Sequence, residues 1–347
     1  MNKLSTSALE SLAPCSLFQS EADAIKERIY VQIKPDLERI ESEIKGQLTS
    51  SVPLISKVGQ YILGSGGKRL RPLLMILSAR LCGYQGNNDT PLAVVFEFVH
   101  AASLLHDDVV DHAEFRRNQP AAKTIWGNPA VVLVGDFLYS KSILMAVEYS
   151  EIRILEVLSD ATTKMAEGEV LQLIHADNLE IDEQEYLQVI TRKTAVLISA
   201  ACHIGAIFGG GETAQQEALR TYGHSLGIAF QLIDDTLDYT GDVEELGKPV
   251  GNDIQEGKAT LPLIYAFRHQ GKNEKKRLRK IFSADEIMPE EFHEVRDIVA
   301  RSGGIEYTQR LAAQHVQQAK EAINIFPSHP TRRLLEDIAD YVICRRV

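Results

Sequence analysis

The residues of this chain best suited to chemistry are aspartates, which gather in two clusters. Both clusters share the spacing i, i+1 and i+4, in Asp107, Asp108 and Asp111 and again in Asp234, Asp235 and Asp238. On an α-helix, residues four apart lie on one face, where like charges destabilise the helix by a few tenths of a kcal/mol. A bound cation would offset that cost, and Mg²⁺ is commonly held by one or two carboxylates together with substrate phosphates. The pattern therefore predicts metal-mediated binding of a phosphorylated ligand between two helices.

The segment at residues 64–72, GSGGKRLRP, is suited to binding phosphate. It places Lys68 and Arg71 after a glycine-rich turn and on one helical face, where Arg offers a planar pair of donors and Lys a point charge. Taken alone, a GGK sequence is more often a solvated helix N-terminus, and the P-loop pattern GxxxxGK[ST] is not matched. Its interpretation as a phosphate site therefore depends on the aspartate clusters.

Other basic residues follow each cluster closely in sequence. Arg116 and Arg117 come after the first cluster, at a spacing that suits a second contact to diphosphate. Lys248 and Lys258 come after the second cluster, in or beside a loop that contains glycine and proline. Such a charged loop is commonly only solvent-facing, but its position directly after carboxylates favours a phosphate-binding lid.

The elements that carry these residues are expected to be helices. Apolar residues recur at helical spacing in residues 22–43, 92–111, 135–149, 152–174, 183–207, 213–239 and 261–269. Charged residues are sparse enough that several of these helices must be buried on most sides, as in the middle of a large bundle. Strand-like alternation flanked by hairpin turns is absent, so no sheet is expected. We predict one all-α domain over residues 1–347, a single large bundle around a deep central cavity, with residues 1–20 as a loosely ordered extension.

Composition narrows the class of protein. The chain has 347 residues, of which 44% are hydrophobic and 24% charged, as is typical of a globular protein with a large core. The net charge of −11 argues against nucleic-acid binding, because such surfaces are basic. Cys15, Cys82, Cys202 and Cys344 are scattered without CxxC or zinc-like spacing, which favours reduced thiols. Neither a secretory signal nor an apolar run of membrane-spanning length is found, so we expect a cytoplasmic protein without a transmembrane segment.

Together these pieces resemble the trans-isoprenyl diphosphate synthase (polyprenyl synthetase) family from about residue 64 to residue 263. The first cluster matches the family's DDxxD motif, and the second matches FQxxDDxxD, which includes Phe230 and Gln231. Residues 66–72 match GGKRxRP, and residues 247–253 match GKxxGxD. The resemblance implies an Mg²⁺-dependent prenyltransferase that condenses isopentenyl diphosphate with an allylic diphosphate head to tail and releases diphosphate. It also implies three Mg²⁺ ions with substrate bound and a homodimer, and a product poorly soluble in water suggests transient membrane contact.

The resemblance assigns roles to individual residues. Contacts to isopentenyl diphosphate are expected from Lys68, Arg71, His100 and Arg117. Contacts to the allylic diphosphate are expected from Arg116, Lys193, Thr194, Gln231, Lys248 and Lys258. The Mg²⁺ ligands are expected to be Asp107, Asp111 and Asp234 most directly, with Asp108, Asp235 and Asp238 in support. In the implied mechanism the aspartates and lysines stabilise charge on the departing diphosphate, while an apolar cavity excludes water from the carbocation.

Product length is expected to depend on small side chains just before the first cluster. Ala102 and Ser103 lie about one helical turn before Asp107, on the side that leads away from the diphosphate. Small residues also serve close helix packing, but the resemblance implies that they let the growing chain pass, as in octaprenyl-like synthases. The floor of the cavity is then expected farther along, on the helix that carries Ile143 and Met145.

Several alternatives remain. A farnesyl or geranylgeranyl diphosphate synthase shares the motifs, although bulk in place of Ala102 or Ser103 would be expected. A non-catalytic subunit of a heteromeric synthase tends to lose the aspartate clusters, which are intact here. A terpene cyclase shares the ionisation step but does not need the basic residues of the 64–72 segment. His106 beside Asp107 also suits a phosphohydrolase metal site, which would leave the second cluster unexplained.

Overall fold

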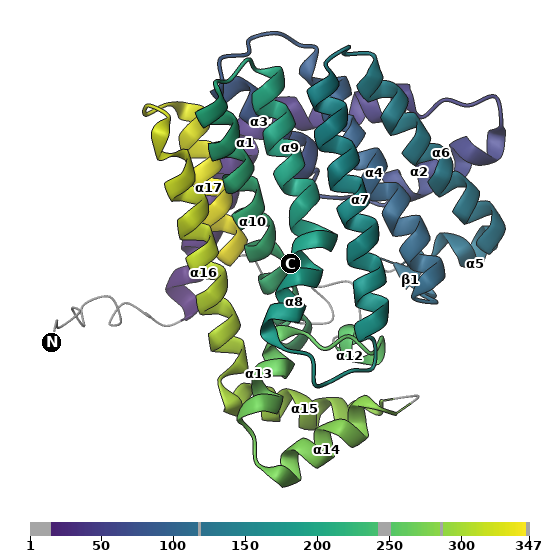
Figure 1. The fold of residues 1–347 in the computed structure, drawn as a ribbon, viewed down its shortest axis with the longest axis vertical. Helices are drawn as coiled ribbons and strands as arrows, with labels where there is room; N and C mark the ends of the chain where they lie inside the picture. Colours follow the sequence, from purple (N-terminus) through teal and green to yellow (C-terminus); the bar gives the residue numbers. More distant parts are fainter. Residues whose placement is uncertain (1–14, 117–118, 242–250, 285–286, 345–347) are drawn as a thin grey trace, which may run out of the picture.

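Most of the described backbone is helical, and most helices run side by side in one bundle (Figure 1). The computed structural model describes residues 15–116, 119–241, 251–284 and 287–344. The bundle contains α1 (Cys15–Gln47), α2 (Pro53–Gly64), α3 (Leu70–Leu81), α4 (Asp89–Val110), α5 (Ala122–Trp126), α6 (Asn128–Val147), α7 (Ile152–His175), α8 (Glu183–Ile190), α9 (Val196–Phe208), α10 (Thr213–Thr240), α16 (Gly304–Ala322) and α17 (Pro330–Cys344). Two short turns, the π-helical η2 (Thr191–Ala195) and the 3-10 helical η3 (Ile323–Ile325), connect α8 to α9 and α16 to α17. The predicted all-α class is confirmed.

The core consists of two clusters of buried side chains that meet at α9. Ile198 and Cys202 of α9 belong to the cluster formed with α10, α16 and α17. Leu197 and Ala201 belong to the cluster formed with α4, α6 and α7. A helix that is apolar on opposite faces belongs in the interior of a bundle, and α9 carries no Asp, Glu, Lys or Arg. Both α4 and α10, which carry the aspartate clusters, pack against α9, so this central helix fixes their relative position.

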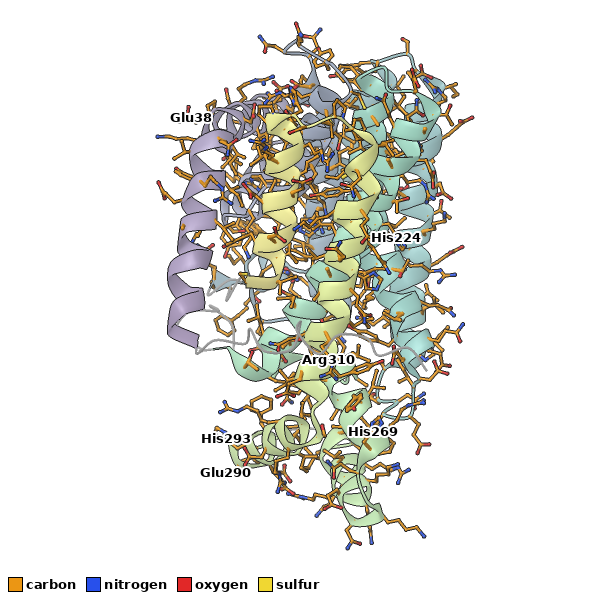
Figure 2. The ribbon with its side chains drawn as sticks, turned by 90° about the vertical axis from the view of Figure 1, so that its left-hand side faces the viewer. Glu38, His224, His269, Glu290, His293 and Arg310 are labelled. Carbon is orange, nitrogen blue, oxygen red and sulfur yellow. The ribbon has the colours of Figure 1, made fainter. Side chains whose placement is uncertain are left out.

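A smaller group of helices lies beyond one end of the bundle. This group contains α13 (Leu261–His269), α14 (Lys272–Phe282) and α15 (Pro289–Ser302), and α16 leads from it back into the bundle (Figure 1). Figure 2 shows His269 of α13 and His293 of α15 on this side of Arg310 in α16. The short α12 (Asn252–Gln255) and β1 (Phe115–Arg116), which follow α10 and α4, lie toward the same end. The aspartate clusters are therefore at the end of the bundle that faces this group.

Two local features differ from the sequence-based expectation. No sheet was expected, but β1 pairs with β2 (Gln119–Pro120) in an antiparallel ladder with Phe115 opposite Pro120. A ladder of two residues per strand is too short to leave an alternating pattern in the sequence. Residues 15–20, expected to be loosely ordered, already belong to α1, while residues 1–14 lie outside the described chain.

The apolar helix α6 is an integral part of the bundle. It is the one helix among the described residues whose length and hydropathy would suffice to cross a membrane, and 39% of that stretch is buried inside the fold. Its Gly135 lies against His106 of α4, so closely that a Cβ there would overlap the imidazole ring. Its buried face, which includes Val131, Leu138 and Met145, joins the core around α4.

Candidate active site

The first aspartate cluster occupies the last turn of α4. Asp107 and Asp111 are half-buried, and the Asp111 N–H donates to the Asp107 carbonyl at 2.8 Å. Asp108 is fully buried, and the Arg116 Nε donates to its Oδ1 at 2.6 Å. The Asp108 Oδ2 has no hydrogen-bond partner within the described part of the chain. Arg116 therefore holds Asp108, and Asp107 and Asp111 are the more accessible carboxylates.

The second cluster lies near the C-terminal end of α10. Asp234 is half-buried. Asp235 is buried and accepts a hydrogen bond on each oxygen, from the Tyr186 hydroxyl at 2.5 Å and from the Gln231 Nε2 at 2.7 Å. Since protein donors occupy both of its oxygens, Asp235 is oriented by its neighbours, and Asp234 is the more accessible of the pair.

Asp238 connects α10 to the start of α12 through two hydrogen bonds. Its Oδ2 accepts the backbone N–H of Asp253 at 3.2 Å, and its carbonyl accepts the N–H of Gly251 at 3.1 Å. Each cluster thus contains at least one buried carboxylate held by protein groups and at least one half-buried carboxylate. Asp107, Asp111 and Asp234 are the half-buried members of the two clusters, and their role as the most direct metal ligands stays a prediction.

Burial raises the pKa of three of these carboxyls, Asp107, Asp108 and Asp235, and neighbouring aspartates add to each shift. Burial raises the pKa of Asp107 to about 6, with Lys193 opposing the shift and Asp111 adding to it. Burial also raises the pKa of Asp235 to about 7, against the two hydrogen bonds on its oxygens. A raised pKa means that the charged form of the carboxyl is under-compensated by its surroundings. The site therefore favours a bound cation that would supply the missing positive charge.

The π-helical turn η2 carries two of the predicted substrate contacts. The Lys193 Nζ donates to Glu169 Oε2 of α7 at 2.7 Å, and the Thr194 hydroxyl donates to Gln231 Oε1 at 2.8 Å. Gly168 of α7 allows this approach, because a Cβ there would lie 2.7 Å from the Lys193 backbone nitrogen. Isolated π-turns inside long helices often mark functional sites. Here the turn links the α7 side of the site to the second cluster through Lys193 and Thr194.

Lys258 connects the loop after α12 to the first cluster. Its Nζ donates to Asp111 Oδ2 at 2.9 Å and to Glu256 Oε2 at 2.6 Å. Although burial opposes the charge, Glu256 and Asp111 raise the pKa of Lys258 above its ordinary value, so the side chain is an ammonium group. A residue predicted from the second motif's surroundings thus contacts the first motif directly.

The predicted contacts to isopentenyl diphosphate are only partly described. Lys68 is exposed, and Arg71 and His100 are half-buried, at the start of α3 and in α4. Arg117 lies outside the described residues, as does Lys248, which was predicted to contact the allylic diphosphate. The structure therefore locates Lys68, Arg71 and His100, and their binding of one common ligand stays a prediction.

Arg69 is a structural residue of this region that we did not single out from the sequence. It is buried in a left-handed conformation with φ of 47°, and it donates to Glu41 Oε1 at 2.7 Å, to Glu97 Oε2 at 2.8 Å and to the Leu63 carbonyl at 2.5 Å. These bonds fasten the 64–68 turn to α1 and α4. The GGKRLRP motif contained Arg69, but only its acidic partners, far away in sequence, reveal its role.

Two cavities adjoin these residues. One of about 150 Å³ is lined by Lys193, Thr194, Gln231, Asp235 and Lys258, among others. The other, of about 220 Å³, is lined by Asp111 and Glu256, among others. Lys258 lines both and therefore lies between the two spaces.

The predicted chain-length residues divide into interior and exterior positions. Ala102 is 1% exposed and Met145 is 2% exposed, and both belong to the core between α4 and α6. Ser103 is half-buried, with its hydroxyl donating to the His100 carbonyl at 2.9 Å. Ile143 is 42% exposed on α6, and its place near the cavity floor stays a prediction. Met145 is the residue of that pair in an interior position.

The donor set suits a hard divalent cation. The accessible groups are carboxylate oxygens, and Asp107 and Asp235 lack full charge compensation. Within the described residues, no group of three or more His, Cys, Asp or Glu side chains is close enough to hold a metal ion by itself. Mg²⁺ sites that are completed by substrate phosphates have this character, with one or two carboxylates and no all-protein cage.

Comparison with known proteins agrees with the family resemblance of the sequence motifs. The model of the polyprenyl synthetase family matches residues 52–299. Octaprenyl diphosphate synthase from Haemophilus influenzae is 42% identical over 305 residues, which are 88% of this chain and 92% of the relative. A short chain isoprenyl diphosphate synthase from Methanothermobacter thermautotrophicus is 36% identical over 314 residues, covering 89% of this chain and 96% of the relative.

A solved structure is also similar to this chain in both fold and sequence. The polyprenyl synthase from Caulobacter crescentus, crystallised with calcium and isoprenyl diphosphate, superposes with a TM-score of 0.89 at 40% identity. The match covers 92% of this chain and 98% of the other. The similarity thus extends over nearly the whole fold as well as over the motifs.

Proposed function

Since the chain belongs to the polyprenyl synthetase family, and is therefore a prenyltransferase, we propose that it makes a long-chain polyprenyl diphosphate of octaprenyl type. The substrates are isopentenyl diphosphate and an allylic diphosphate, joined head to tail with release of diphosphate. The observation that carries the proposal is the position of Lys193 and Lys258 near the carboxylates of α4 and α10: Lys258 donates to Asp111, Lys193 interacts electrostatically with Asp107, and both lysines line one cavity with Asp235. Such a site can bind the diphosphate of an allylic substrate and stabilise it as a leaving group.

The family uses a divalent metal, and we propose Mg²⁺, with three ions when substrate is bound. Asp107, Asp111 and Asp234 would hold these ions, with Asp108, Asp235 and Asp238 orienting them or their waters. When bound, Mg²⁺ would link the carboxylates to the diphosphate and supply Lewis-acid stabilisation of the leaving oxygen.

The chain's own residues would contribute in three ways. Lys193 and Lys258 would stabilise negative charge on the diphosphate as the allylic C–O bond breaks. The basic residues of the 64–72 segment would hold isopentenyl diphosphate so that its double bond attacks the resulting carbocation, and a proton then leaves to the diphosphate. Buried apolar side chains between α4 and α6 would keep water from the cation. No protein nucleophile is required for this sequence of steps.

Two observations favour a long product. The small side chains Ala102 and Ser103 precede the first cluster on α4, leaving room where a bulky residue would end growth. The octaprenyl relative is 42% identical, against 36% for the short-chain relative. A short-chain product is the second candidate, because that relative also covers nearly the whole chain.

We also propose a homodimer. The outer face of α6 carries apolar side chains that are largely exposed to solvent, such as Leu133, which is 66% exposed, and Leu144, which is 56% exposed. Exposed apolar residues continue on the adjacent α7, with Ile174 at 67%. These residues lie on two helices that pack against each other, and large exposed apolar surface commonly marks a protein interface. Sedimentation of a monomer at micromolar concentration would refute this proposal.

The reaction can be tested by following both products of one turnover. Purified protein would be incubated with farnesyl diphosphate, labelled isopentenyl diphosphate and Mg²⁺, and released diphosphate would be compared with incorporated label. We expect equal amounts of each, and no reaction when a chelator removes the metal. Diphosphate release without incorporation would indicate hydrolysis or cyclisation, and no reaction at all would indicate a non-catalytic subunit.

A further inference from the structure

Lys258 lies where its ammonium group competes with any metal ion at the first aspartate cluster. The Nζ is 2.9 Å from Asp111 Oδ2 and 2.6 Å from Glu256 Oε2, so one cation is shared by two carboxylates. Only 20% of Lys258, 19% of Asp111 and 22% of Glu256 is exposed, so solvent screens these charges weakly. The ammonium group therefore offsets the negative charge of Asp111.

Glu256 and the backbone of Gly257, which lie beside Lys258, are held in place by their neighbours. The Asn252 Nδ2 donates to Glu256 Oε1 at 2.7 Å, which leaves Oε2 of the same carboxylate for Lys258. Gly257 has a φ of +68°, and its carbonyl accepts the N–H of Asp177 at 2.9 Å. A Cβ on Gly257 would overlap the Asp177 side chain, so the backbone beside Lys258 is closely fitted to the end of α7. Glu256 is thus an oriented acceptor at a fixed place.

A lysine with two carboxylate partners can leave one without becoming an unpaired buried charge. Breaking a buried ion pair is costly mainly because one charge is left uncompensated. Here the Glu256 contact would persist if Asp111 were taken by a divalent ion. Lys258 also lines the cavity that contains Gln231 and Lys193, so the released ammonium would already border the space beside the second cluster.

We propose that Lys258 masks Asp111 in the metal-free protein, and that Glu256 is the positioning residue that retains the ammonium group when a divalent ion binds Asp111. Metal binding then frees Lys258 from the first cluster and makes its ammonium available to an anionic substrate. The inference rests on the proposed function for the role of Asp111 as a metal ligand. It goes beyond that function by assigning a role to Glu256 and an exchange step to Lys258.

The experiment is a titration of substrate-free protein with Mn²⁺, in which electron paramagnetic resonance measures the free ion. Lys258→Met removes the competing cation, and we expect Mn²⁺ affinity to rise about tenfold, within the roughly 5- to 150-fold range of couplings between two ligands. Glu256→Gln leaves Lys258 with Asp111 alone, and we expect Mn²⁺ affinity to fall several-fold. Lys258→Gln serves as a second variant if Lys258→Met does not fold.

The double variant Lys258→Met with Glu256→Gln tests whether Glu256 acts through Lys258 or only through its own negative charge near the metal site. If Glu256 acts through Lys258, Glu256→Gln has little effect on Mn²⁺ affinity once Lys258 is Met. Additive effects of the two substitutions, or unchanged or weaker Mn²⁺ binding by Lys258→Met, would overturn the proposal.

Control variants come from comparable ion pairs. Lys320 forms a pair of the same 2.9 Å length with Asp340 between α16 and α17, and Lys320→Met is expected to leave Mn²⁺ affinity unchanged. Lys193→Met, whose ammonium is bonded to Glu169, is expected to raise it less than Lys258→Met. Because the titration needs no substrate, it gives its answer even if the wild-type protein fails to incorporate isopentenyl units, a result that would refute the proposed function alone.

Discussion

The hydrogen bond from Tyr186 to Asp235 allows a sharp test of how the second cluster is maintained. Tyr186→Phe removes only a hydroxyl group, whose acceptor is a carboxylate that is 3% exposed. A hydrogen bond to a charged group contributes about 1.5–3 kcal/mol to stability, against about 1 kcal/mol for a neutral one. We therefore expect the free energy of unfolding to fall by about 2 kcal/mol when Asp235 is ionised.

The loss of stability caused by Tyr186→Phe should increase as pH rises. Burial raises the pKa of Asp235 to about 7, and the Tyr186 hydroxyl counteracts this shift by stabilising the charged form. Because the folded-state value lies above that of the unfolded chain, the stabilising contribution of this carboxyl is complete at low pH and is lost as pH rises through about 7. Removing the hydroxyl raises the pKa further, by about one and a half units for about 2 kcal/mol. The deficit of the variant should thus grow as pH rises through neutrality.

The assay is urea denaturation at a pH well below and a pH well above neutrality, with the slope m as a check that the denatured state is unchanged. Tyr222→Phe is the matched control, because Tyr222 is fully buried and its hydroxyl donates to the neutral Leu335 carbonyl at 2.7 Å. The control should cost about 1 kcal/mol at both pH values. An equal and pH-independent cost for both variants would refute the role assigned to the Tyr186 hydrogen bond.

Three further predictions address metal, pH and product length. Asp107→Asn or Asp234→Asn should lower prenyl transfer by about 10²-fold or more with unchanged helix content in circular dichroism, and loss of helix would argue for a structural role instead. Added Mg²⁺ should raise the melting temperature more at neutral pH than near pH 5, because burial raises the pKa of Asp107 to about 6 and metal binding needs its charged form; a constant shift would contradict this. Ser103→Phe should shorten the product with turnover retained, whereas Ile143→Phe, at an exposed position, should leave product length unchanged in chromatography of the dephosphorylated product.

Much of the fold was predictable because it depends on local periodicity. Apolar residues at helical spacing gave the helices, and sparse charge identified the helices of the interior, of which α9 is the clearest case. The aspartate clusters were predictable for the same reason, since residues four apart on a helix share a face. The ladder between β1 and β2 was missed because two residues per strand carry no period.

The unpredicted parts depend on contacts between distant residues. Tyr186 and Asp235 are 49 residues apart, and Lys258 and Asp111 are 147 apart, so no spacing rule connects them. The face of α6 that turns toward the core was not predictable for another reason. The apolar residues of α6 are spread around the helix, so its sequence does not reveal which face turns inward. Only the packing of α6 against α4 shows that Met145 is interior and Ile143 is not.

The most direct test of the central claim is the size of the product. Wild-type protein would be incubated with Mg²⁺, farnesyl diphosphate and an excess of labelled isopentenyl diphosphate, and the dephosphorylated products separated by chain length. A long-chain synthase predicts a main product of octaprenyl size, with intermediates that disappear over time. A product that stops at farnesyl or geranylgeranyl length despite excess isopentenyl diphosphate would contradict the role assigned to the small residues Ala102 and Ser103.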